Sequence, residues 1–511
     1  MQSTNNILHA VRREWTAFRR PGRLIAMATA ALAVVVLGLL YAFGNHASCN
    51  GLCAAPPTGP DGDLVHDQFS FMHRDLGENG AITVRLTSMT GTITYPPPHH
   101  DQIVPGLVPW AKAGIIIKDG VRQGSSYAAL MVTGSHGVRM QYDYRHDVAG
   151  SGGGVSVQAP RWLRLTRSGD TVTGYESADG GRWTRIGTVR LPGLPETVQV
   201  GLFATSPGDL TLRSVGLGGA TEQVRWTQAS GVFDHVGLKG TDAASGWRSG
   251  TVGEANTTDW EKKYLAAGAV EKNGTITVTG SGDIAPSGAE DGARTAESTL
   301  GGLALALLVV LVVAVRLATS AYRREATGGA PVTRAELAAK ATVLAAVTFV
   351  TGLLALGVVI PVGVAILKGN GIPVLAVSAL TEARVVVGTA AALALAAVLA
   401  LALGALLRRA WIAIPVAVLT ILLPYAATSF PLLPDGLSQW LLRVTPAAGF
   451  ATRGTLVAYP QVTAHYAPSA GYFPLPWWAG VAVLGAYAAL LLGLALRRRQ
   501  AGGTRRSAAW R

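Results

Sequence analysis

The chain has 511 residues, enough for several domains, but only 14% of them are charged and 49% are hydrophobic. The net charge of +13 lies outside residues 44–298, which hold 21 Lys and Arg against 25 Asp and Glu. Soluble domains carry about 25% charged residues, and nucleic-acid-binding domains carry a basic patch, so the composition argues for membrane segments and against nucleic acid as a partner.

Residues 1–22 predict a basic amphipathic helix. Val11, Trp15 and Phe18 share one face at helical spacing, and Pro21 with Gly22 ends the pattern. Such a helix suits a membrane interface. An ordinary solvated helix is the alternative, and the apolar run that follows favours the interface.

Six apolar runs have the length of roughly 20 residues that a bilayer requires. The first run forms the predicted span 23–43. It is long for a signal peptide and lacks a clear cleavage site, so we expect it to be retained. The other five lie in 299–499. The runs are Leu24–Phe43, Leu300–Thr319, Thr342–Leu367, Val385–Leu407, Trp411–Phe430 and Pro476–Leu496.

Arginine and lysine are concentrated on one side of these runs, at residues 12–23, 323–340, 408–409 and 497–506. The positive-inside rule therefore places both termini in the cytoplasm, including the basic tail 500–511. It places residues 44–298 outside the cell.

The outside region predicts β-structure. In "VRMQYDYR" Val138, Met140, Tyr142 and Tyr144 alternate with polar residues, which is typical of a half-buried strand. "WLRLTRSGDTVTGYES" and "GYESADGGRWTRIG" predict hairpins, and strands at this spacing indicate an antiparallel sandwich or jelly roll. Gln223–Ile284 could supply further strands or a stalk.

Cys49 and Cys53 follow the first run with three residues between them. On an oxidising side they are a candidate disulfide, and two unpaired thiols are the alternative. A metal site is disfavoured, because no His or Cys pair lies nearby in the sequence.

We identify no catalytic, cofactor-binding or metal-binding residues. Jelly-roll glycosidases need two carboxylates across a groove, and no E-x-D-x-x-E strand motif is present. Asp143, Glu176 and Asp179 are more simply solvent-facing residues, and Trp110 fits a packed core. "PPPHHD", with His99 and His100, is more often a loop than a metal site.

The motifs "WAKAGIIIKDG", "SSYAALMVTGSHGVRMQYDYR", "WLRLTRSGDTVTGYESADGGRWTRIG" and "VQVGLFATS" together resemble concanavalin-like jelly-roll domains of the DUF1349 type, related to laminin-G-like sandwiches. The resemblance covers about 63–219. It implies that the domain binds an extracellular glycan or protein.

The membrane segments resemble bacterial ABC-2-type permeases. The resemblance rests on an ordered set of motifs: "SAYRREATGG", "TRAELAAKA", "ALTEARVVVG", "TPAAGF" and "LALRRR". Thr333 to Glu336 form a capping-box pattern that opens a helix before the third span. The sequence "EATGGAPVTRAE" is less basic than the turn usual in that family.

The resemblance implies a transporter permease subunit, an exporter, that pairs with a second permease subunit and sits on two cytoplasmic ATPase subunits. No P-loop motif G-x-x-x-x-G-K-[ST] is present, so we expect ATP hydrolysis in the partner and no enzyme activity or cofactor in this chain. The alternatives are a membrane-anchored glycan- or protein-binding sensor and a glycan-active enzyme, which the lack of a carboxylate pair at a recognisable spacing disfavours. The predicted ATPase-docking residues are Arg12, Arg13, Trp15, Arg334, Glu336 and Lys340.

Overall fold

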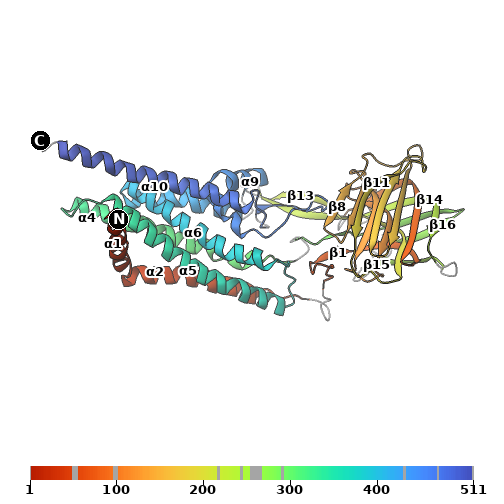
Figure 1. The fold of residues 1–511 in the computed structure, drawn as a ribbon, viewed down its shortest axis with the longest axis horizontal. Helices are drawn as coiled ribbons and strands as arrows, with labels where there is room; N and C mark the ends of the chain where they lie inside the picture. The colour runs from red at the N-terminus through yellow and green to blue at the C-terminus, as the bar shows by residue number, and fades with distance from the viewer. Residues whose placement is uncertain are drawn as a thin grey trace.

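The molecule is elongated, with helices at one end and β-sheets at the other (Figure 1). The computed structural model describes residues 2–48, 56–95, 102–215, 219–241, 246–253, 267–288, 293–429, 433–468 and 471–508. Both chain termini lie at the end of the helical part that faces away from the sheets, which we call the distal end. The opposite end of the helices, next to the sheets, is called the junction.

Six helical segments among the described residues are long and apolar enough to cross a membrane, in the places where the sequence predicted them. They are α2 (Pro21–Gly44), α4 (Leu303–Ala326), α5 (Arg334–Gly369), α6 (Ala379–Leu407), the segment Ala410–Ser429, and the first part of α10 (Trp477–Ala508). Shorter elements complete the helical part: α1 (Gln2–Phe18), η3 (Ala296–Leu300), α9 (Asp435–Val444) and η5 (Pro446–Arg453).

Local sequence sets where these helices begin. Pro21 is the first residue of α2, a position that needs no backbone N–H, and Arg20 before it is extended. The Thr333 hydroxyl accepts a hydrogen bond from the Glu336 backbone N–H at 3.1 Å, which confirms the predicted cap. The helix it opens does not stop before the third span: α5 is one helix of 36 residues.

The segment Ala410–Ser429 is not a regular α-helix. It consists of α7 (Ala410–Ala417), a π-helical turn η4 (Val418–Leu422) and α8 (Leu423–Ser429). Pro415 and Pro424 each remove a backbone donor from the ladder of hydrogen bonds. A wider turn in this stretch accommodates those losses.

The β part has two large sheets and a two-stranded pair, and every pairing is antiparallel. The first sheet runs β11-β10-β9-β3-β14-β17-β16, with β13 and β4 beside it; the second runs β15-β2-β12-β5-β6-β7-β8; β1 pairs with β18. The strands are β1 (Val65–Asp67), β2 (Phe69–Leu76), β3 (Asn79–Thr94), β4 (Ile103–Pro105), β5 (Lys112–Lys118), β6 (Tyr127–Thr133), β7 (Val138–Tyr142), β8 (His146–Ala149), β9 (Arg161–Ser168), β10 (Thr171–Ser177), β11 (Thr184–Arg190), β12 (Val198–Thr205), β13 (Asp209–Val215), β14 (Gly219–Lys239), β15 (Arg248–Val252), β16 (Gly268–Lys272), β17 (Thr275–Gly280) and β18 (Ile284–Pro286). Both predicted hairpins, β9–β10 and β10–β11, are present.

The seven-stranded sheet is covered on both faces. Leu163 and Leu165 of β9 pack against Ile115 and Ile117 of β5 in a core between the two large sheets. A second apolar cluster that includes Ile116 covers the other face, so β5 and β6 have no exposed residue. Burial on both faces explains the nearly continuous apolar run in the sequence of β5.

One predicted strand face differs in the structure. Val138 and Met140 enter the core between the sheets, but Tyr144 packs on the opposite face with Tyr127, their ring centres 4.9 Å apart. The cause is a turn after Tyr142, in which Asp143 and Tyr144 have φ values of 44° and 65°. The left-handed turn breaks the alternation that the sequence pattern assumed.

Two fully buried lysines tie the strand pair β1–β18 to the seven-stranded sheet. Lys118 Nζ lies 2.7 Å from Asp67 Oδ2 and also donates to the Ser125 carbonyl and the Tyr144 hydroxyl. Lys112 Nζ donates to Asp283 Oδ1 at 2.5 Å. Sequence patterning placed no charge in the core, because a lysine at a strand end normally indicates a solvated position.

Replacing one member of such a pair leaves the other charge buried alone. We expect Lys118→Ala to lower the free energy of unfolding of the β part by about 3–5 kcal/mol. Arg85→Ala is the control, since Arg85 pairs with Asp234 in a partly exposed bridge and its loss should lower the free energy of unfolding much less. Urea unfolding of the intact chain in detergent, followed by tryptophan fluorescence, measures both, and equal losses would contradict the assignment.

Candidate functional site

The distal end of the helical part joins the N-terminal helix α1 to α5. Phe18, at the last turn of α1, is 1% exposed and belongs to the same apolar cluster as Leu337 and Ala341 of α5. Val11, two turns earlier, is partly buried against that cluster. The face that the sequence predicted as apolar therefore seats α1 on the protein, except that Trp15 is 44% exposed.

An ionic cluster reinforces this contact. Lys340 Nζ lies 2.6 Å from Glu14 Oε2 on α1 and 2.8 Å from Glu336 Oε1, one turn earlier on α5. The Lys340 side chain is 2% exposed and that of Glu14 is 8% exposed. We call Glu14, Glu336 and Lys340 the distal clamp, because together they link two helices through buried charges.

The six residues predicted to dock an ATPase all lie in this region, but the structure divides them into two groups. Arg12, Arg13, Trp15 and Arg334 are exposed, and the Arg334 Nε donates to the Leu496 carbonyl at 2.9 Å. Glu336 and Lys340 instead belong to the distal clamp. Glu14, which completes the clamp, was not singled out by the sequence.

Other candidates from the sequence fall elsewhere. Cys49, Cys53, His99 and His100 lie outside the described residues. Across the part of the chain that the structure describes, no group of three or more His, Cys, Asp or Glu side chains could hold a metal ion.

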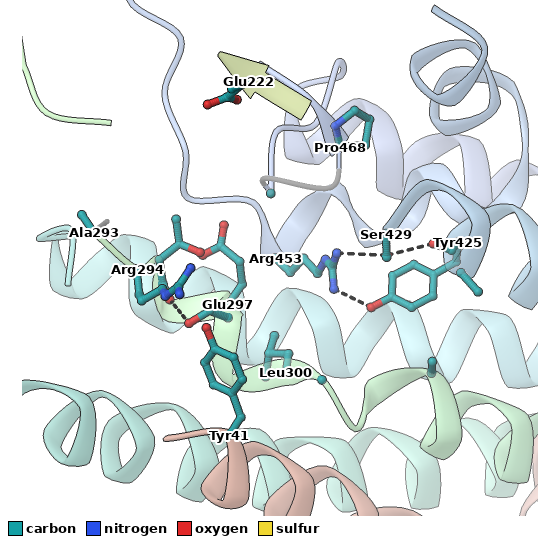
Figure 2. Close-up of a pocket in the computed structure, with 16 residues that line it drawn as sticks. Tyr41, Glu222, Ala293, Arg294, Glu297, Leu300, Tyr425, Ser429, Arg453 and Pro468 are labelled. Atoms are coloured by element: carbon teal, nitrogen blue, oxygen red, sulfur yellow. Dashed lines mark hydrogen bonds between the residues drawn. The ribbon is translucent and has the colours of Figure 1, made fainter. Parts of the chain in front are cut away.

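A cavity of about 480 Å³ lies at the junction (Figure 2). Its walls come from η3, α2, α8, η5 and the start of β14, so helical and β segments both contribute. Figure 2 shows Glu297 and Arg453 on facing sides of this space, which we call the junction cavity. The sequence analysis singled out neither Glu297 nor Arg453 as a candidate site residue.

Glu297 is a buried carboxylate at the start of the second apolar segment. It is 6% exposed and accepts hydrogen bonds from the Thr455 backbone N–H at 2.9 Å and from the Thr455 hydroxyl. Burial raises the pKa of Glu297 above that of an ordinary glutamate, and the bonds from Thr455 offset part of that rise.

Arg453 has hydrogen-bonding capacity to spare. It donates to the Tyr425 hydroxyl at 2.5 Å, and its guanidinium lies 4.8 Å from the centre of that ring. Its buried Nε has no hydrogen-bond partner among the described residues. The junction cavity thus has an arginine and a carboxyl group with a raised pKa in its lining, an arrangement suited to a polar ligand.

The carboxylates of the β part hold loops in place. Glu176 is buried and accepts from the Ser151 N–H at 2.8 Å, so the solvent-facing interpretation was wrong for this residue. Burial also raises the pKa of Asp143, which accepts from the Ser126 hydroxyl. Asp179 caps a hairpin turn, and the backbone N–H groups of Arg182 and Gly181 lower its pKa to about 2.

Comparison with known proteins gives no family assignment. No family model matches the sequence, and no curated protein matches it. A crystal structure of a functionally unknown protein from Saccharomyces cerevisiae aligns at 14% identity over 37% of this chain and 84% of that one, with a TM-score of 0.21. The GH43 protein BlXynB from Bacillus licheniformis aligns at 14% identity over 32% of this chain and 28% of that one, with a TM-score of 0.20. Scytalido-glutamic peptidase aligns at 8% identity over 42% of this chain and 98% of that one, with a TM-score of 0.26.

These matches correct one prediction. The sequence led us to expect no enzyme activity in this chain, yet a glycoside hydrolase and a peptidase are among the solved structures similar to it. At such low identity and TM-score the matches assign neither an activity nor a catalytic residue to this chain, and the expectation of no enzyme activity is not carried further. None of these three structures is an ABC-2 permease, so the family resemblances remain predictions.

Removing the cation of the distal clamp tests its structural role. In Lys340→Ala the buried Glu14 carboxylate loses the cation that pairs with it, and we expect α1 to separate from α5. Amide hydrogen exchange in Gln2–Phe18 should accelerate roughly 100-fold, the effect of losing about 3 kcal/mol from a buried ion pair. Arg12→Ala, an exposed change on the same helix, should leave exchange unaltered; unchanged exchange in Lys340→Ala would contradict the clamp.

The raised pKa of Glu297 predicts a pH dependence of stability. Its contribution is fully present below the pKa of an unfolded glutamate, about 4.3, and is lost as the pH rises through the higher folded pKa. Glu297→Gln stays neutral and can still accept a hydrogen bond from Thr455, so its melting temperature relative to that of the wild type should increase as the pH rises above about 4.3. The exposed Glu196→Gln serves as the control. If the melting temperature of Glu297→Gln fell relative to that of the wild type as the pH rises, the pKa shift of Glu297 would have the opposite sign.

Proposed function

We propose that the chain is the membrane-spanning permease subunit of an ABC-2-type transporter, an exporter driven by ATPase subunits on other chains. In this proposal six helices cross the plasma membrane of a bacterium, and the β part is a jelly-roll domain on the outside, between the first and second spans. The arginines at the distal end support this orientation by the positive-inside rule. Arg408 and Arg409, for example, follow α6 at that end, and Arg408 lies 5.6 Å from the ring of Tyr322 on α4.

The distal clamp is the observation that carries the proposal. An interfacial helix that only anchored the chain would need apolar contacts alone. Here the buried ion pair between Glu14 and Lys340 joins α1 to a helix that is long enough to cross the membrane. A force on α1 from a cytoplasmic partner would therefore move α5.

The exposed residues of this region would form the docking surface. Arg12, Arg13 and Arg334 would pair with acidic side chains of an ATPase, and Trp15 would add an apolar contact. Glu336 and Lys340 would transmit motion inside the permease.

A second permease subunit has an available surface on α10. Gly480 is used within the chain, since a side chain there would meet the Ala448 carbonyl, but Gly485 and Gly493 have open space around them. Small residues on an open helix face allow close packing of membrane helices. In an assembled exporter the junction cavity would receive polar groups of the cargo on the outer side.

Co-purification tests this function. We expect the tagged intact chain, extracted from native membranes in mild detergent, to bring down a P-loop ATPase. The triple variant Arg12→Ala/Arg13→Ala/Arg334→Ala should lose most of it. The triple variant Arg182→Ala/Arg185→Ala/Arg190→Ala, which removes three exposed arginines from the β part, should retain it.

The result that overturns the proposal is equally specific. If no ATPase accompanies the wild type, and glycans or surface proteins bind through the β part instead, the chain is a membrane-anchored binding or sensory protein.

A further inference from the structure

A second cavity, of about 560 Å³, lies at the distal end between α1, the start of α2, the end of α4 and the start of α5. Its lining is dominated by cationic side chains: Arg13, Arg20, Arg23, Arg324 and Lys340, against the two carboxylates Glu14 and Glu336. We call this space the distal pocket. Seven charged groups with an excess of three positive charges surround one small volume.

The carboxylates do not balance this excess. Both already contact Lys340, at 2.6 and 2.8 Å, and Arg324 is 3.7 Å from Glu336. Arg13 and Arg20 make no ion pair with any described carboxylate, and Arg23 donates to the Ala17 carbonyl at 3.1 Å. Arginines cannot relieve their mutual repulsion by losing a proton, so the arrangement favours a bound anion.

The surroundings of the pocket indicate what kind of anion. Arg20 and Arg23 stand at the start of α2, whose apolar side chains are widely exposed from the first turn onward: Leu24 is 42% exposed and Ile25 is 64% exposed. A soluble anion would bind to the cations alone and would not require an exposed apolar surface beside them. A cationic pocket at the edge of an exposed apolar helix matches a molecule with an anionic head and hydrocarbon tails.

We propose that the distal pocket binds the phosphate headgroup of an anionic phospholipid, whose tails lie along α2. The inference rests on the membrane placement in the proposed function, and it requires neither the ATPase nor transport. The headgroup phosphate, with one negative charge, offsets part of the excess positive charge of the pocket and so holds α1 at the membrane surface. Arg20 and Arg23 line the pocket and bind the phosphate directly.

The experiment uses the intact chain, purified, delipidated in detergent and free of any ATPase. Binding is measured by microscale thermophoresis against short-chain phosphatidylglycerol, short-chain phosphatidylcholine and inorganic phosphate. We expect phosphatidylglycerol to bind, phosphatidylcholine to bind much more weakly, and inorganic phosphate to compete only at far higher concentration.

Two matched double variants locate the site. Arg20→Ala/Arg23→Ala removes two pocket cations and should weaken phosphatidylglycerol binding roughly 30-fold, as expected for two cations near an anionic headgroup. Arg19→Ala/Arg323→Ala removes the same charge from exposed neighbours outside the pocket and should change binding less than about twofold. Arg20→Lys/Arg23→Lys keeps the charge and should keep most of the binding, which separates charge loss from misfolding.

Three results would overturn the proposal: equal losses in the two alanine pairs, binding of phosphatidylcholine as tight as that of phosphatidylglycerol, or inorganic phosphate competing as well as the lipid. The last would identify the ligand as a free anion. Because no ATPase is present, any of these results leaves the permease assignment untouched.

Discussion

The ammonium group of Lys340, held between Glu14 and Glu336, determines where α1 can lie. A buried lysine costs several kcal/mol unless a carboxylate compensates it, and the same holds for a buried glutamate. Glu336 alone could pair with Lys340 along α5, but Glu14 would then be buried without a cation. Since Glu14 and Phe18 are one helical turn apart, the ionic and the apolar contacts act on the same face of α1 and select one register.

The β part repeats this principle with different partners. Asp67 belongs to β1 and Asp283 immediately precedes β18, and each is held by a lysine of β5 that has no exposed surface. These pairs fix the strand pair β1–β18 on the outer face of the seven-stranded sheet. That position matters for the whole molecule, because the chain enters the sheets just before β1 and leaves them after β18 toward η3.

Much of this architecture follows from sequence patterns, and the parts that do not share a cause. Bilayer-length apolar runs, the Thr333 cap and the β9–β10 hairpin depend on neighbours in sequence, so their signals are local. Lys118 and Glu297 are buried, and their side-chain partners lie in distant segments: Asp67 is 51 residues from Lys118, and Thr455 is 158 residues from Glu297. Lys340 pairs locally with Glu336, but its second partner, Glu14, lies on α1. Without knowledge of that partner, each reads as a solvated charge, as Lys340 did when it was grouped with the exposed docking residues.

The helix α5 brings the two candidate sites into one mechanical unit. Its 36 residues span roughly 54 Å at 1.5 Å per residue. Its first two turns carry Glu336 and Lys340. Asn370, which follows its last residue, donates to the carbonyls of Ala42 and Asn45 at the C-terminal end of α2. Near that end Gly363 lies against Thr299 of η3, two residues after Glu297, where a larger residue would clash.

A displacement applied to α1 would therefore pass through a continuous helix to the wall of the junction cavity. At that wall β14 begins, with Glu222 paired to His465, and the same strand continues into the core of the sheets at Phe233. Buried, specific contacts therefore join α5 to α1 at the distal end and to α2 and η3 at the junction, so one continuous helix connects the two candidate sites.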